Sequence, residues 1–96
     1  MRVEFVRRDG GPERLESDAE LSFEGDGPLA GVKLVGFSIW RGADGQLFVT
    51  LPARVYGAGD ERRFFDLLRP VEGAPESSKR VKAWILSEYQ ARRDAA

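Results

Sequence analysis

The sequence contains no cysteine and no histidine, and these two absences remove several kinds of chemistry at once. A chain without cysteine has no thiol nucleophile and no thiolate metal ligand. A chain without histidine also lacks the commonest general base of enzymes. We therefore expect a protein that is not an enzyme, with no catalytic residues, no metal site and no cofactor.

Long apolar runs are missing too. The longest uncharged apolar stretch is far too short to cross a bilayer, so we expect no membrane span. The N-terminus, Met1 to Phe5, has an acidic residue early and no apolar run behind it, which does not match a signal peptide. Together with the lack of cysteine, these features predict a cytoplasmic protein.

A strong net charge is the third absence. The 15 Lys and Arg residues nearly balance the 16 Asp and Glu residues, which leaves a net charge of −1 and a pI near 5.5. Neutralised phosphates supply most non-specific affinity for nucleic acids, so the charge of the whole chain argues against an electrostatically driven binder. Any nucleic-acid binding must therefore come from a local patch.

What is present is typical of one small globular domain. The chain has 96 residues, of which 42% are apolar and 32% charged, an ordinary composition for a soluble protein. A chain of this size removes only about 60 to 65% of its unfolded surface from water. Its own core is thin, and self-association would add burial.

Turn signals at nearly regular spacing indicate an antiparallel β meander. The clearest is Asp44-Gly45, a tight turn followed by Leu47, Val49 and Leu51 on one face of a strand and Phe48 on the other. Similar signals lie at 9–12, 25–28 and 57–60. They predict about five strands, at 2–7, 14–24, 29–41, 46–52 and 62–70.

The strand predicted at 29–41 does not alternate cleanly between apolar and polar residues. Val32 and Leu34 lie on one face, whereas Val35, Phe37 and Ile39 lie on the other. A bulge near Gly36 and burial on both faces are two explanations, and both remain open here.

The last predicted element is one amphipathic helix over 76–93, and it makes the fold α+β. Its start is indicated by Pro75, Glu76 and two serines, and an apolar stripe at helical spacing contains Val81, Trp84, Ile85 and Tyr89. The helix is roughly 25 Å long at about 1.5 Å per residue, too small to cover both faces of a five-stranded sheet. We therefore expect a homodimer whose interface buries three exposed aromatic residues, Phe48, Phe64 and Phe65.

Residues 44–90 resemble the SpoVG family of small bacterial regulators. Members share a Gly-Leu-Phe-Val-x-Met-Pro strand, a short Phe-Arg-Asp-x-x-x-Pro-Ile strand and a closing helix that ends near Glu-Tyr. The matching residues here are Gly45, Leu47, Phe48, Val49, Leu51 and Pro52, then Phe64, Asp66, Pro70 and Val71, then Ile85, Leu86, Glu88 and Tyr89.

The resemblance implies a dimeric SpoVG-like α+β fold and a regulator that binds DNA or RNA, linked to septation, cell division or sporulation. Basic residues around the helix and the neighbouring loops are implied to contact the nucleic acid. Three positions depart from the family pattern, because Phe65 replaces the usual Arg, Leu51 the usual Met and Ala53 the usual Ser.

Basic residues gather in the C-terminal half of the chain, whereas the N-terminal half is acidic. Two interpretations fit, a solvated surface balanced by local acids and, with the family resemblance, a nucleic-acid site. Tyr56, in a Gly-rich loop beside Arg54, is the best candidate for stacking on a base. The predicted nucleic-acid-binding residues are Arg54, Tyr56, Arg62, Arg63, Lys79, Arg80 and Lys82.

Other charged residues are better explained without a ligand. Glu16, Asp18, Glu20 and Glu24 share one strand face and diverge too much to hold a metal ion, and they would repel phosphate nearby. Glu88 interrupts the apolar stripe of the helix, so we expect it to pair with an arginine or to lie at a subunit boundary. An alternative function is a protein-interaction module of the same fold that binds no nucleic acid, which the acidic pI favours.

Overall fold

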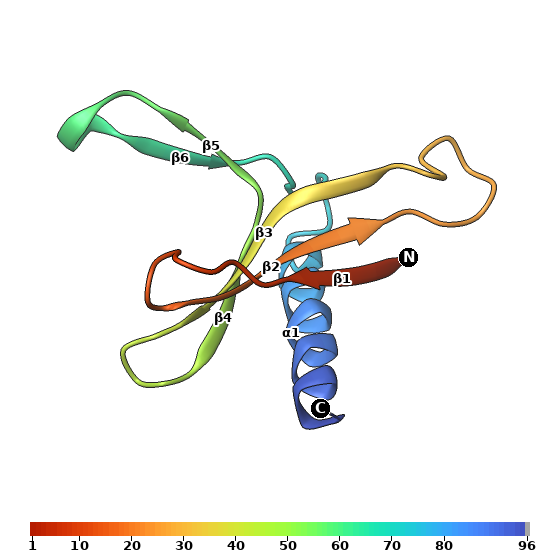
Figure 1. The fold of residues 1–96 in the computed structure, drawn as a ribbon. Coiled ribbons are helices and arrows are strands. Elements are labelled where there is room, and N and C mark those ends of the chain that lie inside the picture. The colour runs from red at the N-terminus through yellow and green to blue at the C-terminus, as the bar shows by residue number, and fades with distance from the viewer. Residues whose placement is uncertain (96) are drawn as a thin grey trace.

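The computed structural model describes residues 1–95 and consists of an antiparallel sheet, a separate hairpin and one C-terminal helix (Figure 1). The expected α+β class with a single closing helix is confirmed. In chain order the elements are β1 (Arg2–Val6), β2 (Leu15–Ser22), β3 (Lys33–Arg41), β4 (Leu47–Thr50), β5 (Ala53–Tyr56), a short 3-10 turn (Gly59–Glu61), β6 (Arg63–Asp66) and α1 (Ser77–Ala95).

The main sheet has the strand order β1-β2-β3-β4, and every neighbouring pair is antiparallel. Strand β2 alternates as its sequence predicts, with Ala19 and Leu21 buried and the acidic residues between them on the opposite face. The tight turn at Asp44-Gly45 joins β3 to β4, and the Gly45 N–H donates to the Gly42 carbonyl at 2.9 Å. The first four strands therefore form the predicted meander.

Strand β3 contains the bulge that was one explanation of its irregular pattern. Ala19 pairs with Phe37 and Leu21 with Leu34, so β3 has one extra residue between the two pairs. Gly36 takes up that residue with a φ of +106°. Val35 is half exposed, which excludes burial of this strand on both faces. The strand begins at Lys33, not at 29, because residues 29–31 form a turn.

Helix α1 covers one face of the main sheet and completes the core (Figure 1). Ile85 is fully buried against Val3, Phe37 and Ile39, and Val81, Trp84 and Tyr89 pack around it. Near the end of the helix, the Arg92 guanidinium donates to the Val3 carbonyl at 2.7 Å. This face of the sheet is thereby closed, whereas the opposite face stays open.

The prediction of a fifth strand in the meander is wrong. Residues 63–66 do form a strand, but β6 pairs with β5, and the two make a separate two-stranded sheet. The reason lies at Leu51-Pro52, where both residues are buried and the strand is interrupted. Proline lacks an N–H for the sheet ladder, and the Pro52 carbonyl instead accepts the Leu67 N–H at 2.7 Å. The chain therefore leaves the main sheet at Pro52. After β6 it comes back beside Pro52, where this hydrogen bond closes the base of the hairpin.

Within residues 1–95, the one α-helix, α1, is too polar to span a membrane.

Candidate nucleic-acid interface

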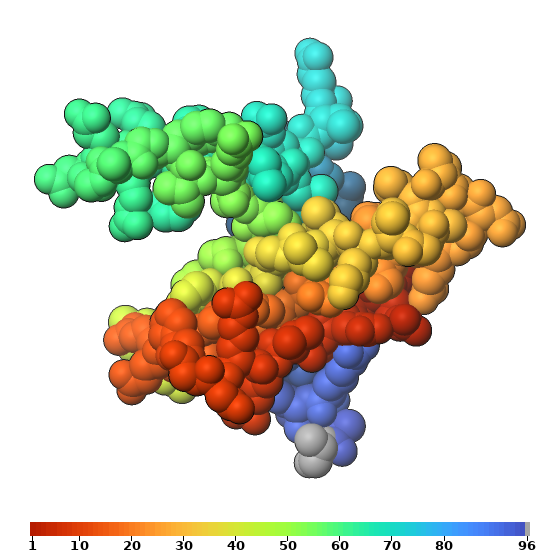
Figure 2. Space-filling model, turned by 45° about the horizontal axis from the view of Figure 1, so that its top comes forward, coloured from red at the N-terminus to blue at the C-terminus, as the bar shows by residue number. Residues whose placement is uncertain are grey.

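The β5–β6 hairpin projects from the body of the molecule and is exposed on both faces. All eight of its strand residues are exposed, and Figures 1 and 2 show it extending away from the sheet and α1. Its tip is closed by Gly57, whose φ is +81° and where a Cβ would lie only 2.6 Å from the Glu61 carbonyl oxygen. The tip therefore requires glycine, and it holds Arg62 and Arg63 at the far end of the hairpin.

The pairing register gives the hairpin two different faces. Val55 lies opposite Phe64, whereas Arg54 lies opposite Phe65 and Tyr56 opposite Arg63. Because directly opposed residues of a ladder share a face and neighbours along a strand alternate, Val55 and Phe64 form an apolar face. The other face, which we call the aromatic–cationic face, consists of Arg54, Tyr56, Arg63 and Phe65.

The aromatic–cationic face is organised by contacts among its own side chains. The rings of Tyr56 and Phe65 meet edge to face, with centroids 5.1 Å apart and an interplanar angle of 78°. The Arg54 guanidinium lies 5.2 Å from the centroid of the Tyr56 ring, within the range of a cation–π contact. A shallow cavity of about 490 Å³ opens beside these groups, and it is lined by Tyr56, Arg63, Phe65, Asp66, Leu67 and Arg69.

Several cations on or near the main sheet form ion pairs with other described residues, whereas those of the hairpin do not. Arg7 and Arg14, outside the hairpin, also form none within residues 1–95. On the main sheet, Arg8 pairs with Asp18, Lys33 with Glu20 at 2.9 Å, and Arg41 with Glu16 at 3.5 Å. The arginines of the hairpin have no such partner within residues 1–95. Their positive charge is consequently available to a ligand. These arginines are Arg54, Arg62 and Arg63.

The acidic strand face is less repulsive toward phosphate than its sequence suggests. Glu16, Asp18 and Glu20 each form an ion pair across to a neighbouring strand or loop, and they are half-buried, not fully exposed. The hydrogen bond and the charge of Glu20 raise the pKa of Lys33 above its ordinary value. The open face of β2 is thus a ladder of neutralised pairs, because antiparallel pairing brings opposite charges together across strands.

The apolar face of the hairpin turns toward the main sheet. Val55 and Phe64 line a cavity of about 370 Å³ together with Trp40 and Phe48 from β3 and β4. Phe65 is on the opposite face of the hairpin. The three aromatic residues expected to share one dimer surface are therefore split, with Phe48 and Phe64 on one side and Phe65 on the other.

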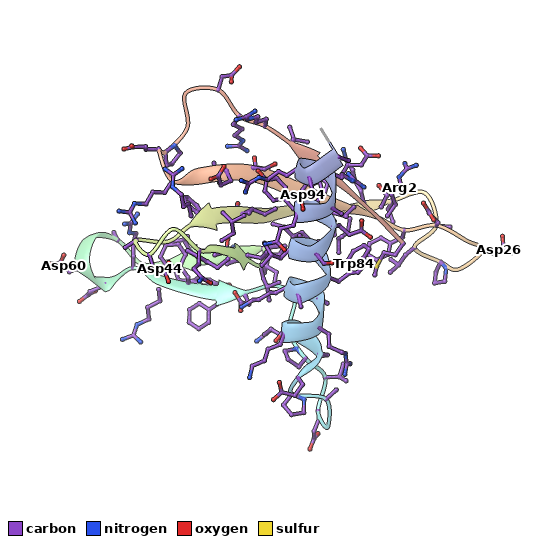
Figure 3. All side chains as sticks on the ribbon, turned by 90° about the horizontal axis from the view of Figure 1, so that it is seen from below. Arg2, Asp26, Asp44, Asp60, Trp84 and Asp94 are labelled. Carbon is purple, nitrogen blue, oxygen red and sulfur yellow. The ribbon has the colours of Figure 1, made fainter. Side chains whose placement is uncertain are left out.

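The seven predicted nucleic-acid residues fall into two groups as well. Arg54, Tyr56, Arg62 and Arg63 come together on the hairpin, whereas Lys79, Arg80 and Lys82 lie in the first turns of α1. Figures 1 and 3 show the hairpin tip, marked by Asp60 in Figure 3, well away from the start of the helix. Lys79 also pairs with Glu76 at 3.3 Å.

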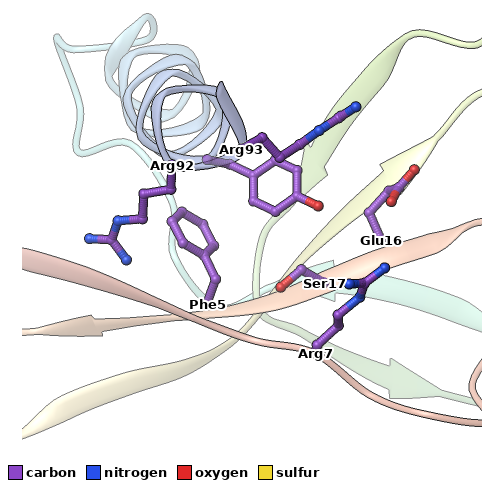
Figure 4. Close-up of a pocket in the computed structure, with 7 residues that line it drawn as sticks. Phe5, Arg7, Glu16, Ser17, Arg92 and Arg93 are labelled. Carbon is purple, nitrogen blue, oxygen red and sulfur yellow. The ribbon is translucent and has the colours of Figure 1, made fainter. Parts of the chain in front are cut away.

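Two cavities contain cations or aromatic rings that are not among the seven predicted nucleic-acid residues. Phe65 and Arg69 line the aromatic–cationic cavity, whereas the sequence assigned Phe65 to a dimer interface. A second cavity, of about 520 Å³, lies between β1, β2 and the end of α1 (Figure 4). Its residues are Phe5, Arg7, Glu16, Ser17, Tyr89, Arg92 and Arg93.

The side chains that line this second cavity have a structural role, because they hold α1 to the main sheet. Arg92 is engaged by the Val3 carbonyl, and its guanidinium lies 4.9 Å from the Phe5 ring centroid. The Phe5 and Tyr89 rings meet edge to face at 5.2 Å. Figure 4 shows Arg92 beside Phe5, with Arg7, Glu16 and Arg93 around the opening. Glu88, expected to pair with an arginine, is half-buried on α1 and forms no ion pair within the described residues.

Comparisons of the whole chain with protein-family models, with curated proteins and with solved structures found no match.

Proposed function

We propose that this protein is a SpoVG-like regulator that binds DNA or RNA through the aromatic–cationic face of its β5–β6 hairpin. The observation that carries the proposal is the position of Arg54 and Arg63 on the same hairpin face as two exposed aromatic rings, with Arg62 at the adjacent tip, and none of the three forms an ion pair among residues 1–95. Unpaired guanidinium groups suit phosphate oxygens because their planar N–H donors match them in geometry and charge.

The distribution of ion pairs supports this interpretation over ordinary surface charge. A solvated surface with no ligand is usually balanced locally, as it is around Arg8, Lys33 and Arg41. In the hairpin the three arginines form no ion pair with any described residue, although three acidic residues, Asp60, Glu61 and Asp66, lie in the same segment. We propose that Arg54, Arg62 and Arg63 contact the phosphate backbone, and that Lys79, Arg80 and Lys82 on α1 form a second, separate set of contacts.

A homodimer formed through the apolar face of the hairpin is the second part of the proposal. An isolated two-stranded hairpin is at best marginally stable in water and needs a surface to pack against. Here Phe64 is 66% exposed and Phe48 is 47% exposed, and they line one cavity. A second copy of the chain supplies the missing cover, and it leaves the aromatic–cationic face free for nucleic acid. The link to septation, cell division or sporulation comes from the family resemblance alone.

Nucleic-acid binding is tested by fluorescence anisotropy with labelled DNA and RNA, single-stranded and duplex, at two salt concentrations. We expect the affinity to fall as salt is raised, because binding to phosphates releases counterions. We also expect R62E combined with R63E to weaken binding at least tenfold. A matched control combines R7E with R14E, which changes the net charge equally but away from the hairpin.

The proposal is overturned if no nucleic acid binds at low salt, or if the two double variants bind equally. The alternative, a protein-interaction module of the same fold, is favoured by the exposed apolar side chains of the hairpin and by the net charge of −1. It predicts that charge reversal at Arg62 and Arg63 removes a protein partner while nucleic-acid binding is absent throughout.

A further inference from the structure

We propose that the aromatic–cationic face accepts an unpaired base, so that the hairpin prefers single-stranded nucleic acid to duplex. This inference rests on the proposed function and specifies the ligand of the same site. It is built from the free ring surface, the shape and charge of the cavity, and the identity of the side chains at its centre.

A stacking surface remains open on Phe65. In an edge-to-face pair, either the Tyr56 edge covers one face of Phe65 or the Phe65 edge points at Tyr56. In both arrangements Phe65 keeps at least one ring face that Tyr56 does not cover, and the Arg54 guanidinium lies over Tyr56 instead. The Phe65 residue is 48% exposed, as is Tyr56. Base stacking on such rings is the usual basis of single-strand binding.

The shallow cavity beside the rings has room for a flat ring and a charge that suits a phosphate. Its volume of about 490 Å³ lies within the roughly 300–1,000 Å³ typical of small-ligand sites. Two guanidinium groups, Arg63 and Arg69, line it against one carboxylate, Asp66. The excess positive charge disfavours a cationic guest such as a methylated ammonium group, which aromatic cages otherwise bind. It favours a ligand that combines a flat ring with an anion.

A duplex satisfies this site poorly. Its bases are stacked inside the helix, so their faces are not available to an aromatic side chain without unstacking. A two-stranded ribbon also fits a major groove, but there it reads base edges through hydrogen-bonding side chains. The centre of this face has Tyr56 and Phe65, and Phe has no hydrogen-bonding group. The two rings therefore suit base faces better than base edges.

The test compares four ligands of one mixed sequence, each about 20 nucleotides long: single-stranded DNA, single-stranded RNA and the duplex of each. Anisotropy should show tighter binding to at least one single strand than to its duplex. The ratio of the affinities for single-stranded DNA and single-stranded RNA identifies which of the two is the better ligand, because only RNA has the 2′-hydroxyl.

Two substitutions separate stacking from mere apolar contact. F65L keeps an apolar side chain but removes the ring, and we expect it to weaken single-strand binding by roughly 5- to 100-fold and to weaken duplex binding by a smaller factor. F65W keeps a ring and should retain the affinity. Y56L serves as a second, independent variant. Both residues are half exposed, and far-UV circular dichroism verifies the fold of each variant.

The outcomes distinguish this inference from the function on which it rests. Equal or tighter binding to duplex, or no effect of F65L and Y56L on single strands, overturns the base-stacking inference while nucleic-acid binding stands. Absence of binding to all four ligands at low salt overturns the proposed function itself.

Discussion

At the scale of single residues, Gly36 shows how one position directs the chain. Its φ of +106° suits glycine, and a Cβ there would lie 3.1 Å from the Pro52 Cβ and 3.4 Å from its Cα. Gly36 belongs to the bulge in β3, whereas Pro52 ends the main sheet and starts the hairpin. The close approach of Gly36 to Pro52 therefore places the bulge of β3 against the residue at which the chain leaves the main sheet.

We predict that G36A destabilises the fold by about 1–3 kcal/mol, because alanine is strained at this φ and its methyl group presses against Pro52. Urea unfolding monitored by circular dichroism measures the change. The matched control is G27A, at a glycine without a positive φ and with nothing within 4 Å of the added Cβ. Equal stability of the two variants would refute the role given to Gly36.

Arg92 is a second residue whose role depends on distant partners. Its guanidinium donates a hydrogen bond at 2.7 Å to the carbonyl of Val3, which lies 89 positions away along the chain. The same guanidinium lies 4.9 Å from the centroid of the Phe5 ring. We predict that R92A lowers the unfolding free energy by about 1–2 kcal/mol, since both a hydrogen bond from a charged group and packing of the side-chain stem are lost. R80A, at an exposed arginine of the same helix, should change stability by less than about 0.5 kcal/mol in the same denaturation experiment.

At the scale of elements, β2 and β3 stabilise each other through charge as well as through the ladder. The pKa of Lys33 is raised chiefly by its hydrogen bond to Glu20 and also by the Glu20 charge. A raised folded-state pKa means that the contribution to stability is present below the unfolded value, about 10.4 for lysine, and is lost as pH rises through the folded value.

The corresponding prediction compares the wild type with K33M across that pH range. The wild type should lose more stability than K33M between about pH 10 and pH 11.5, because only the wild type has the Lys33 charge to lose. Below pH 9 the difference between the two should be constant. Thermal melts at fixed pH steps measure both, and parallel curves throughout would contradict the prediction. The effect is small, because the pair is exposed to solvent.

At the scale of the whole molecule, the hairpin is the element to which we propose that a second copy binds. Residues 1–95 leave both faces of β5–β6 uncovered: Val55 and Phe64 lie over an open cavity, and Tyr56 and Phe65 face solvent. Exposed apolar surface that adjoins a groove is typical of an interaction site. In the proposed dimer, Val55 and Phe64 contact a second copy of the chain, whereas Tyr56 and Phe65 stay free for nucleic acid.

The two opposite faces make this assignment testable by one matched pair of substitutions. We predict that F64D converts a dimer into a monomer at micromolar concentration, because a carboxylate buried in an apolar interface without a partner is costly. F65D makes the same chemical change at the adjacent residue, on the other face, and should leave the dimer intact while it weakens nucleic-acid binding. Sedimentation equilibrium measures the mass. A wild-type monomer, or equal dissociation by both variants, would refute the interface.

Features of the fold that depend on neighbouring residues could be predicted from the sequence. The alternation in β2, the Asp44-Gly45 turn and the apolar stripe of α1 each follow from local periodicity and turn chemistry. The cluster Arg54, Arg62 and Arg63 was also recognisable, because a short loop keeps these residues close. Phe65 was harder to assign. The alternation of a strand places Phe64 and Phe65 on opposite faces, but it does not show which distant residues lie next to each face.

The amino-acid sequence alone therefore determined the class of the fold, the four strands of the meander, the closing helix and the basic residues of the hairpin, because nearest neighbours dictate these through period and turns. The tertiary structure alone decided that the chain leaves the sheet at Pro52, that the acids of β2 are neutralised and that Lys79, Arg80 and Lys82 lie apart from the hairpin. Each of these depends on contacts between residues far apart in the chain, and no local pattern records such contacts.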